Sequence, residues 1–288
     1  MTGVQTCALP ILLGHFYGAQ AMAMMTVALG SLLVGAPVLG GHVAVVLAAV
    51  LWTVGTVLGL VTAVALPVRL FTRDDVRPDE AGGAWLMSIV PPMVSAATGP
   101  ALAAHIADAE SRATLLMVCG ALFGAAFLAG LITISMVWSR LAHHGIGAAA
   151  AVPTLWIVLG PLGQSATAAH TLAGATGALR PDLATAASAA AVVVAVPVLG
   201  FALLWMAIAT TLTVRTARAG LPFTLSWWSF TFPVGTCATG FSGLAATLGL
   251  PLLDAVAVLL FVMLVAAWLV VATRTAGLVR AALPTLAA

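Results

Sequence analysis

One eight-residue pattern recurs inside three apolar stretches of the chain and constrains the fold more than any other feature. The copies begin at Pro92, Pro161 and Pro233, 69 and 72 residues apart, and read PMVSAATG, PLGQSATA and PVGTCATG. Each copy has a proline, a polar residue three positions later and a threonine six positions later. About 70 residues accommodate two membrane-spanning helices with their loops. The spacing therefore predicts a repeated helical hairpin with one motif helix in each unit.

The stretches around the motif are apolar enough to lie in lipid. Hydrophobic residues make up 62% of the chain and charged residues only 6%, too few to cover a water-soluble core. Apolar runs of about 20 residues, the length of a membrane helix, recur along the sequence. We expect an all-α integral membrane protein with eight transmembrane helices, at residues 17–37, 43–67, 84–104, 113–138, 152–176, 184–212, 225–248 and 252–273.

A weaker copy of the motif lies in the first of these spans. The segment QAMAMMTV begins at Gln20, 72 residues before Pro92, and keeps a threonine, Thr26, at the sixth position. Four hairpins are therefore visible, each pairing a motif helix with a more aliphatic partner. Residues 12–280 are expected to form a single transmembrane domain, followed by a cytoplasmic tail at 281–288. The first eleven residues, MTGVQTCALPI, resemble a translated sequencing adapter and are excluded from these predictions.

The arginines indicate how the chain is oriented in the membrane. Two arginines, Arg112 and Arg180, fall on one side of the predicted spans. Because arginine-rich short loops stay in the cytoplasm, we expect the other side and the carboxyl terminus to be cytoplasmic. All ten basic residues are arginines, which is typical of GC-rich bacterial genomes, so we expect a bacterial cytoplasmic membrane. The arginines of the cytoplasmic side are Arg69, Arg73, Arg77, Arg140, Arg215, Arg218, Arg274 and Arg280.

The prolines predict kinked helices with a polar stripe. A proline inside a helix removes one backbone donor and clashes with the preceding turn, and the exposed polar backbone must then face protein or a water-filled cavity. The positions one before, three after and six after the proline share one helix face. Ordinary kinks buried in a bundle are the competing interpretation for any one proline. With Thr26 of the first span, the predicted pore-lining stripes are Pro91, Ser95 and Thr98; Gly160, Gln164 and Thr167; and Phe232, Thr236 and Thr239.

Phe232 is the one large side chain at a stripe position otherwise held by Pro91 and Gly160. A single ring in a passage lined by small residues and hydroxyls would act as a plug. Packing against a neighbouring helix is the competing explanation, and Phe230 is the alternative residue for the role.

The predicted spans contain few other residues that could bind an ion or take part in a reaction. No aspartate, glutamate or arginine lies near the middle of a span, although intramembrane charges usually mark ion or proton sites. His170, six residues after Gln164, could titrate, but a hydrogen bond near the helix end is the simpler interpretation. No nucleophile with a base and no metal-ligand cluster is evident, so we expect neither an enzyme nor a cofactor or metal. Gly55 with Gly59, and Gly120 with Gly124, have the spacing that allows close helix packing.

The segments HFYGAQAMAMMT at 15–26, WLMSIVPPMVSAATG at 85–99, PTLWIVLGPLGQ at 153–164 and WWSFTFPVG at 227–235 together resemble the tellurite-resistance/dicarboxylate transporter family. That family includes bacterial tellurite-resistance proteins, malate permeases, fungal sulfite efflux pumps and plant slow-type anion channels. The resemblance implies ten helices, arranged as five hairpins around a pore, in a trimer. It also implies a phenylalanine gate on the ninth helix, which corresponds to Phe232, and an absent first hairpin.

These observations predict passive or weakly coupled transport of small anions. Kinked helices and hydroxyls can partly replace an anion's hydration, and arginines at the cytoplasmic mouth raise the local anion concentration. C4-dicarboxylate, tellurite, sulfite, chloride and nitrate are the substrates considered. The alternative is a proton-coupled carboxylate carrier of the same fold, and a membrane-embedded enzyme is a weaker third. The expected partners are small anions, the lipid bilayer and copies of the same chain in a homotrimer, without nucleic acid.

Overall fold

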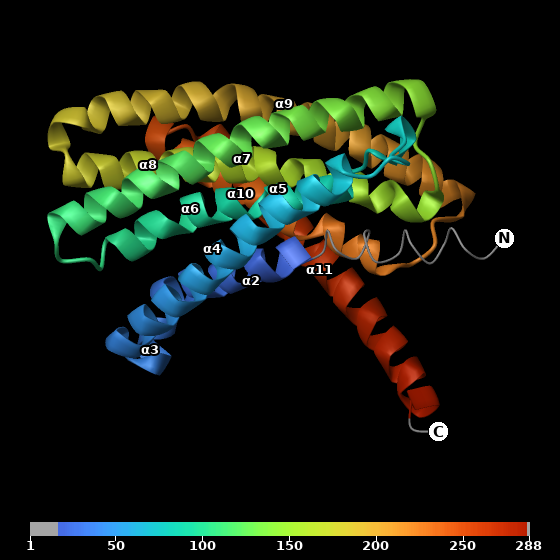
Figure 1. The fold of residues 1–288 in the computed structure, drawn as a ribbon, viewed down its shortest axis with the longest axis horizontal. Coiled ribbons are helices and arrows are strands. Elements are labelled where there is room, and N and C mark those ends of the chain that lie inside the picture. The colour runs from blue at the N-terminus through green and yellow to red at the C-terminus, as the bar shows by residue number, and fades with distance from the viewer. Residues whose placement is uncertain (1–16, 287–288) are drawn as a thin grey trace.

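A computed structural model describes residues 17–286 of the chain, and its regular elements in that range are helices (Figure 1). Each of the eight expected ranges contains a helical segment, in the expected order. The segments are α2 (Tyr17–Gly30), η1 (Ser31–Gly35) and α3 (Ala36–Leu39); α4 (Gly41–Phe71); η3 (Gly83–Trp85), α5 (Leu86–Ile89) and α6 (Pro91–Ala103); α7 (Ala109–His144); η4 (Ala149–Val158) and α8 (Leu159–Leu179); η5 (Pro181–Leu183) and α9 (Ala184–Gly220); η6 (Leu225–Phe230) and α10 (Phe232–Leu248); and α11 (Pro251–Leu286).

Six helical segments in the described part of the chain are long and apolar enough to cross a membrane. A seventh candidate is the pair 83–89 and 91–103, whose two parts meet at an angle of 45°. Helix α10 has 17 residues and continues a separate short 3-10 segment, η6. The all-α membrane class is therefore confirmed, whereas the count of eight spanning helices stays a prediction.

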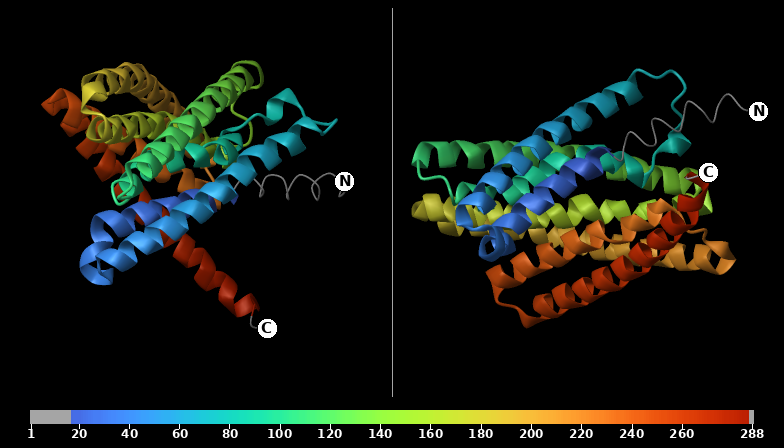
Figure 2. Two further views of the ribbon diagram at one scale, coloured as in Figure 1. Left: turned by 60° about the vertical axis from the view of Figure 1, so that its left-hand side comes forward. Right: turned by 90° about the horizontal axis from the view of Figure 1, so that it is seen from below.

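The helices pack as consecutive antiparallel hairpins. Helix α2 packs against α4, α6 against α7, α8 against α9, and α10 against α11. The first members of these pairs also contact one another, α2 with α6, α6 with α8 and α8 with α10. Figure 2 shows α4 and α11 at opposite sides of the bundle. The motif helices thus form an inner row, and their partners lie outside it.

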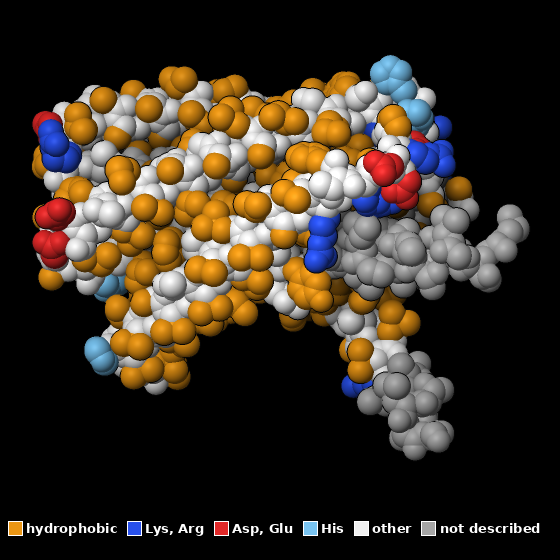
Figure 3. All heavy atoms as spheres, in the orientation of Figure 1, with side chains coloured by type: hydrophobic (Ala, Val, Ile, Leu, Met, Phe, Trp, Pro, Cys, Tyr) orange, Lys and Arg blue, Asp and Glu red, His pale blue; other side chains and the backbone are white. Residues whose placement is uncertain are grey.

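Burial separates the two kinds of helix. Nearly all of α6 and the first half of α8 are buried, whereas the outer helices expose many large apolar side chains. An apolar exterior is what a helix needs where its neighbour is lipid rather than water. Charged side chains gather at the two ends of the bundle, with a mainly apolar surface between them (Figure 3). The carboxyl ends of α4, α7, α9 and α11, which carry most of the arginines, lie at the same end (Figures 1 and 2).

The prolines mark helix beginnings more than kinks within helices. Pro92 is the second residue of α6, Pro161 the third of α8 and Pro233 the second of α10. A proline in the first turn removes a donor that has no intrahelical partner anyway, and its fixed φ suits the helix. The expected kink is present as the 45° bend before α6. Before α8 and α10 the preceding turns are 3-10 helix instead.

Two glycine pairs behave differently from each other. A Cβ on Gly55 would lie 2.9 Å from the carbonyl oxygen of Ala21, and one on Gly59 would lie 2.8 Å from Cβ of Pro91. These glycines allow α2 and α6 to approach α4 closely, as predicted. Among the described residues, nothing lies within 4 Å of a Cβ placed on Gly120 or Gly124. The close packing predicted for that second pair is therefore wrong within residues 17–286, because α7 turns this face away from the other described helices.

Candidate functional site

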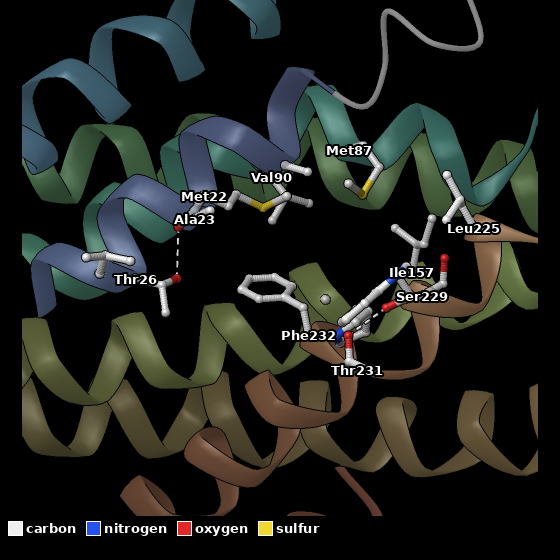
Figure 4. Close-up of a pocket in the computed structure, with 15 residues that line it drawn as sticks. Met22, Ala23, Thr26, Met87, Val90, Ile157, Leu225, Ser229, Thr231 and Phe232 are labelled. Atoms are coloured by element: carbon white, nitrogen blue, oxygen red, sulfur yellow. Dashed lines mark hydrogen bonds between the residues drawn. The ribbon is translucent and has the colours of Figure 1, made fainter. Parts of the chain in front are cut away.

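A pocket of about 380 Å³ lies between α2 and the beginnings of the later motif helices (Figure 4). Helix α2 contributes one wall, α5 and the end of η4 a second, and η6 with the start of α10 a third. The lining is mostly apolar and contains three hydroxyl groups, those of Thr26, Ser229 and Thr231. A mainly apolar pocket with a few polar groups is the usual form of a small-molecule site.

The starts of three motif helices meet at this pocket. Val90 is the residue before α6, Gly160 the second residue of α8 and Phe232 the first residue of α10, and all three line the pocket. The residues before α6 and α8, Val90 and Val158, are themselves helical, so these two helices continue from the segments before them. Helix α10 follows the non-helical Thr231, and the positive end of its dipole at this space favours a negatively charged occupant.

Thr231 separates α10 from the segment before it. Its backbone angles, φ −98° and ψ −84°, are not helical. Its hydroxyl donates to the carbonyl of Trp228 at 2.7 Å, and its own carbonyl accepts from Val234 and Gly235 at 3.0 and 3.1 Å. Because Pro233 has no N–H to donate, the new helix starts here. The break places Phe232 at the tip of α10.

The ring of Phe232 projects into the pocket toward Met22 and Thr26 of α2 (Figure 4). The hydroxyl of Thr26 donates to the carbonyl of Met22 at 2.8 Å, so its oxygen can still accept a hydrogen bond. The glycine at position 160 leaves space, because a Cβ there would come no nearer than 4.0 Å to its closest neighbour, Cγ of Pro233. The predicted gate therefore shares the pocket with a glycine on α8 and points toward a hydroxyl on α2.

Phe230, the alternative to Phe232, lies among aromatic side chains instead. Its ring packs edge-on against Trp156, with centroids 5.4 Å apart, and against Trp227 at 5.7 Å. The guanidinium of Arg274 on α11 lies 5.1 Å from the Trp227 ring. Phe230 is not one of the residues that line the pocket. Phe230 therefore packs η6 against Trp156 and Trp227 and does not line the pocket.

Most of the predicted stripe lies outside the pocket, within helix interfaces. The buried hydroxyl of Ser95 accepts from Thr56 at 3.0 Å and lies 2.9 Å from the sulfur of Met25. Thr236 is buried, and its hydroxyl is within 3.3 Å of the carbonyls of Leu159 and Gly160. Pro91, Thr98 and Gln164 are likewise buried outside the pocket.

Thr167 and Thr239 lie two turns beyond Gly160 and Phe232 on their helices. Their hydroxyls are 2.8 Å apart, with Thr167 half-buried and Thr239 exposed. Thus the structure brings Thr26, Gly160 and Phe232 together at the pocket and places this hydroxyl pair farther along α8 and α10.

Several lining residues were not found from the sequence. Met22, Met87 and Ile157 look like ordinary membrane-helix residues, and only folding shows that they share one space. Ser229 and Thr231 alternate with Phe230 and Phe232 along the chain, so proximity to the expected gate was the one available signal.

His170, the titratable residue singled out in a motif helix, does not line the pocket. Nδ1 of His170 lies 3.1 Å from the hydroxyl of Thr247, and its ring packs where a side chain on Gly243 would sit. His170, near the middle of α8, therefore contacts the carboxyl-terminal end of α10. Among the described residues, no three His, Cys, Asp or Glu side chains lie together as metal ligands would.

The sequence matches a family model described as voltage-dependent anion channel over residues 5–276. Sulfite efflux pumps of Trichophyton rubrum and Arthroderma benhamiae are each 25% identical over 232 residues, covering 78% of this chain and 61% of the relative. An uncharacterized transporter of Methanocaldococcus jannaschii is 26% identical over 188 residues, covering 65% of this chain and 52% of the relative. The chain thus spans about three fifths of the length of the sulfite pumps it matches. No solved structure matches it significantly.

Proposed function

The chain belongs to the voltage-dependent anion channel family, and from this premise we propose that it conducts small anions through a pathway that Phe232 closes. The family assignment agrees with the predicted resemblance, since the relatives include sulfite efflux pumps. The matching proteins are described as channels, pumps and transporters, and none as an enzyme.

The observation that carries the proposal is the meeting of three helix beginnings at one pocket. Val90, Gly160 and Phe232 place the amino ends of α6, α8 and α10 around the same space. Helix α10 is separated from η6 by the non-helical Thr231, and discontinuous membrane helices commonly point their amino ends at anionic substrates. Partial positive charges of the backbone can attract an anion weakly enough for it to leave again, which conduction requires. The ring of Phe232 fills part of this space and closes the pathway.

The surrounding architecture is proposed to have five hairpins. The pocket lies between α2 and α10, at the two ends of the inner row, where a further hairpin would complete the wall of a pore. We assign that place to a further hairpin, which the described residues 17–286 do not contain. The expected adapter segment, residues 1–11, lies outside the described part of the chain, and the family model matches from residue 5. Three such chains are proposed to assemble as a homotrimer.

The membrane orientation follows from the arginines. The arginine-rich carboxyl ends of α4, α7, α9 and α11 are placed in the cytoplasm of a bacterial cell, by the positive-inside rule. Residues 281–288 then belong to the cytoplasmic side. Arginines at this mouth raise the local concentration of anions near the pathway.

Transport in proteoliposomes tests this function. The product of the full genomic reading frame is reconstituted, and uptake of sulfite, chloride, nitrate, tellurite and malate is measured at clamped voltage. We expect passive uptake of small anions that follows their own gradient and is unchanged by a pH gradient. A pH gradient that drives malate uptake in the absence of a malate gradient would instead support the proton-coupled carrier. Uptake equal to that of empty liposomes would reject both.

A further inference from the structure

Two adjoining cavities lie on the outer surface formed by α4, α5 and α7, away from the proposed anion pathway. The first is an apolar groove of about 420 Å³ that runs between α4 and α7 over the beginning of α6. Its lining includes Val64, Ile132 and Met136, whose exposed fractions are 63%, 65% and 43%. Such side chains face lipid in a membrane protein, so the groove suits an acyl chain.

The second cavity continues the groove at the arginine-rich end of the bundle. It has a volume of about 540 Å³ and shares Trp85 and Met136 with the groove. Its cationic and titratable lining consists of Arg77, Arg140, His143 and His144. We call it the basic pocket. A tryptophan at the junction is typical of the level where lipid headgroups begin.

Arg140 gives the basic pocket a buried positive charge. This residue is only 9% exposed, and its guanidinium donates to the carbonyls of Ala81 at 2.9 Å and Gly145 at 3.2 Å. Neutral carbonyls fix its position, and Asp79 interacts with its charge electrostatically without forming an ion pair. Arg140 takes part in none of the three ion pairs found among the described residues. An arginine held this way is ready for a ligand with anionic oxygens.

The rim of the basic pocket is less strongly charged. Arg77 pairs with Asp79 at 2.8 Å, but its side chain is 72% exposed and can turn toward a second anion. His143 is tied by Nδ1 to the carbonyl of Ser139 at 2.8 Å. The carboxylate of Asp79 therefore competes with any anionic ligand for Arg77, and its charge opposes binding.

We propose that the groove and the basic pocket together bind one anionic phospholipid, with an acyl chain in the groove and the phosphate against Arg140 and Arg77. The continuity of an apolar groove with a cationic end matches the two halves of such a lipid, and basic pockets at the cytoplasmic ends of membrane helices are known headgroup sites. A free phosphate ion would leave the groove unused. The site is separate from the pocket at Phe232, so it stands independently of the proposed transport pathway.

Native mass spectrometry of the full chain in detergent tests this site, with phosphatidylglycerol and phosphatidylcholine titrated in parallel. We expect tighter binding of phosphatidylglycerol, and a loss of about five-fold in Arg77→Ala. Asp79→Asn removes the competing carboxylate and should strengthen binding, which a damaged fold cannot do. Ala125→Trp should weaken binding by filling the groove, which Ala125 lines. Arg218→Ala is the matched control, because it removes one exposed arginine at the same end outside both cavities.

Three results would overturn the proposal. Equal losses of phosphatidylglycerol binding in Arg77→Ala and Arg218→Ala would show that the lipid is attracted only by the overall positive charge of this end. Phosphatidylglycerol binding that persists in Ala125→Trp but is displaced by inorganic phosphate would show a free-anion site. Cross-linking of Met136→Cys to a second copy of the chain in membranes would show that another protomer covers this surface.

Discussion

At the scale of single residues, the glycines of the motif helices have opposite roles that the sequence alone does not distinguish. Gly160 borders open space at the pocket, whereas a Cβ on Gly163 would collide with the backbone of Thr236 and Cys237 on α10. Gly163 lies in the second copy of the motif, and Gly160 directly precedes that copy, three residues earlier. They differ because α10 packs closely against Gly163 and leaves space at Gly160, and this depends on the tertiary arrangement.

Gly163→Ala is therefore expected to destabilise the protein, and Gly160→Ala is not. Overpacking of a tight helix contact usually lowers the free energy of unfolding by about 1–3 kcal/mol. Thermal unfolding in detergent, followed by size-exclusion chromatography, measures the difference between the variants. Equal stability of the two variants would contradict the close approach of α8 and α10.

Of the three residues that directly precede the motif prolines, two line the pocket. The repeat register singled out Phe232 and Gly160, and both residues line the pocket. The same register included Pro91, which instead packs against α2 and α4 near Gly18 and Gly59. The bend before α6 brings Val90 to the pocket in its place. A sequence repeat thus predicts which positions are equivalent. A local bend in one helix can still place the adjacent residue at the pocket instead of the equivalent one.

At the scale of helices, the motif prolines were expected to kink continuous helices and instead lie in first turns. The pattern predicted the position of each interruption correctly. It could not predict the form, because a bend, a 3-10 segment and a complete break all accommodate the same proline. The non-helical backbone at Thr231 is stabilised by its hydroxyl bond to Trp228, a contact that the repeat does not encode.

Pro233→Ala distinguishes a helix beginning from a kink. A proline in a helix interior costs about 3 kcal/mol, so its removal would strongly stabilise the protein. A proline in a first turn restricts the unfolded chain, and its removal should destabilise by about 0.4–1 kcal/mol. Chemical or thermal unfolding of purified Pro233→Ala shows whether the replacement raises or lowers the stability. A large gain in stability would contradict the position of Pro233 in α10.

Helix α7 begins at a carboxylate whose effect on stability should depend on pH. The side chain of Asp108 accepts from the backbone N–H of Ser111 at 2.7 Å, and hydrogen bonding from the side chain and then the backbone of Ser111 lowers the pKa of Asp108 below its ordinary value of 3.8. Because the folded pKa is the lower one, the stabilisation is present above that ordinary value and is lost as the pH falls through the folded pKa. Asp108→Ala should unfold at a lower temperature at neutral pH. The difference from the unmodified protein should shrink in acid, and a difference that grew in acid would contradict the cap.

At the scale of the whole molecule, the hairpin order and the membrane class were predictable because hydropathy and repeat spacing depend on sequence alone. The pocket between α2 and α10 was not, because it depends on how four hairpins turn around one another. The six clearly spanning helices and the short α10 also show that length alone does not define a span in a protein of broken helices.

The proposed orientation places the carboxyl terminus in the cytoplasm. A carboxyl-terminal green fluorescent protein should therefore fluoresce, whereas alkaline phosphatase fused at the same point should be inactive. The opposite pair of results would reverse the orientation and place the arginine-rich end outside.

Cross-linking of the same fusion in membranes should yield a trimer, and a monomer at comparable expression would reject the proposed assembly.

The anion conductance of Phe232→Ala, measured beside that of Phe230→Ala in the full reading frame at equal surface expression, tests the gate directly. Removing the ring that projects into the pocket should raise the conductance well above that of the unmodified protein. Removing the ring packed between Trp156 and Trp227 should not raise it and should lower stability. An unchanged conductance in Phe232→Ala, or an increase confined to Phe230→Ala, would contradict the claim that Phe232 closes the pathway.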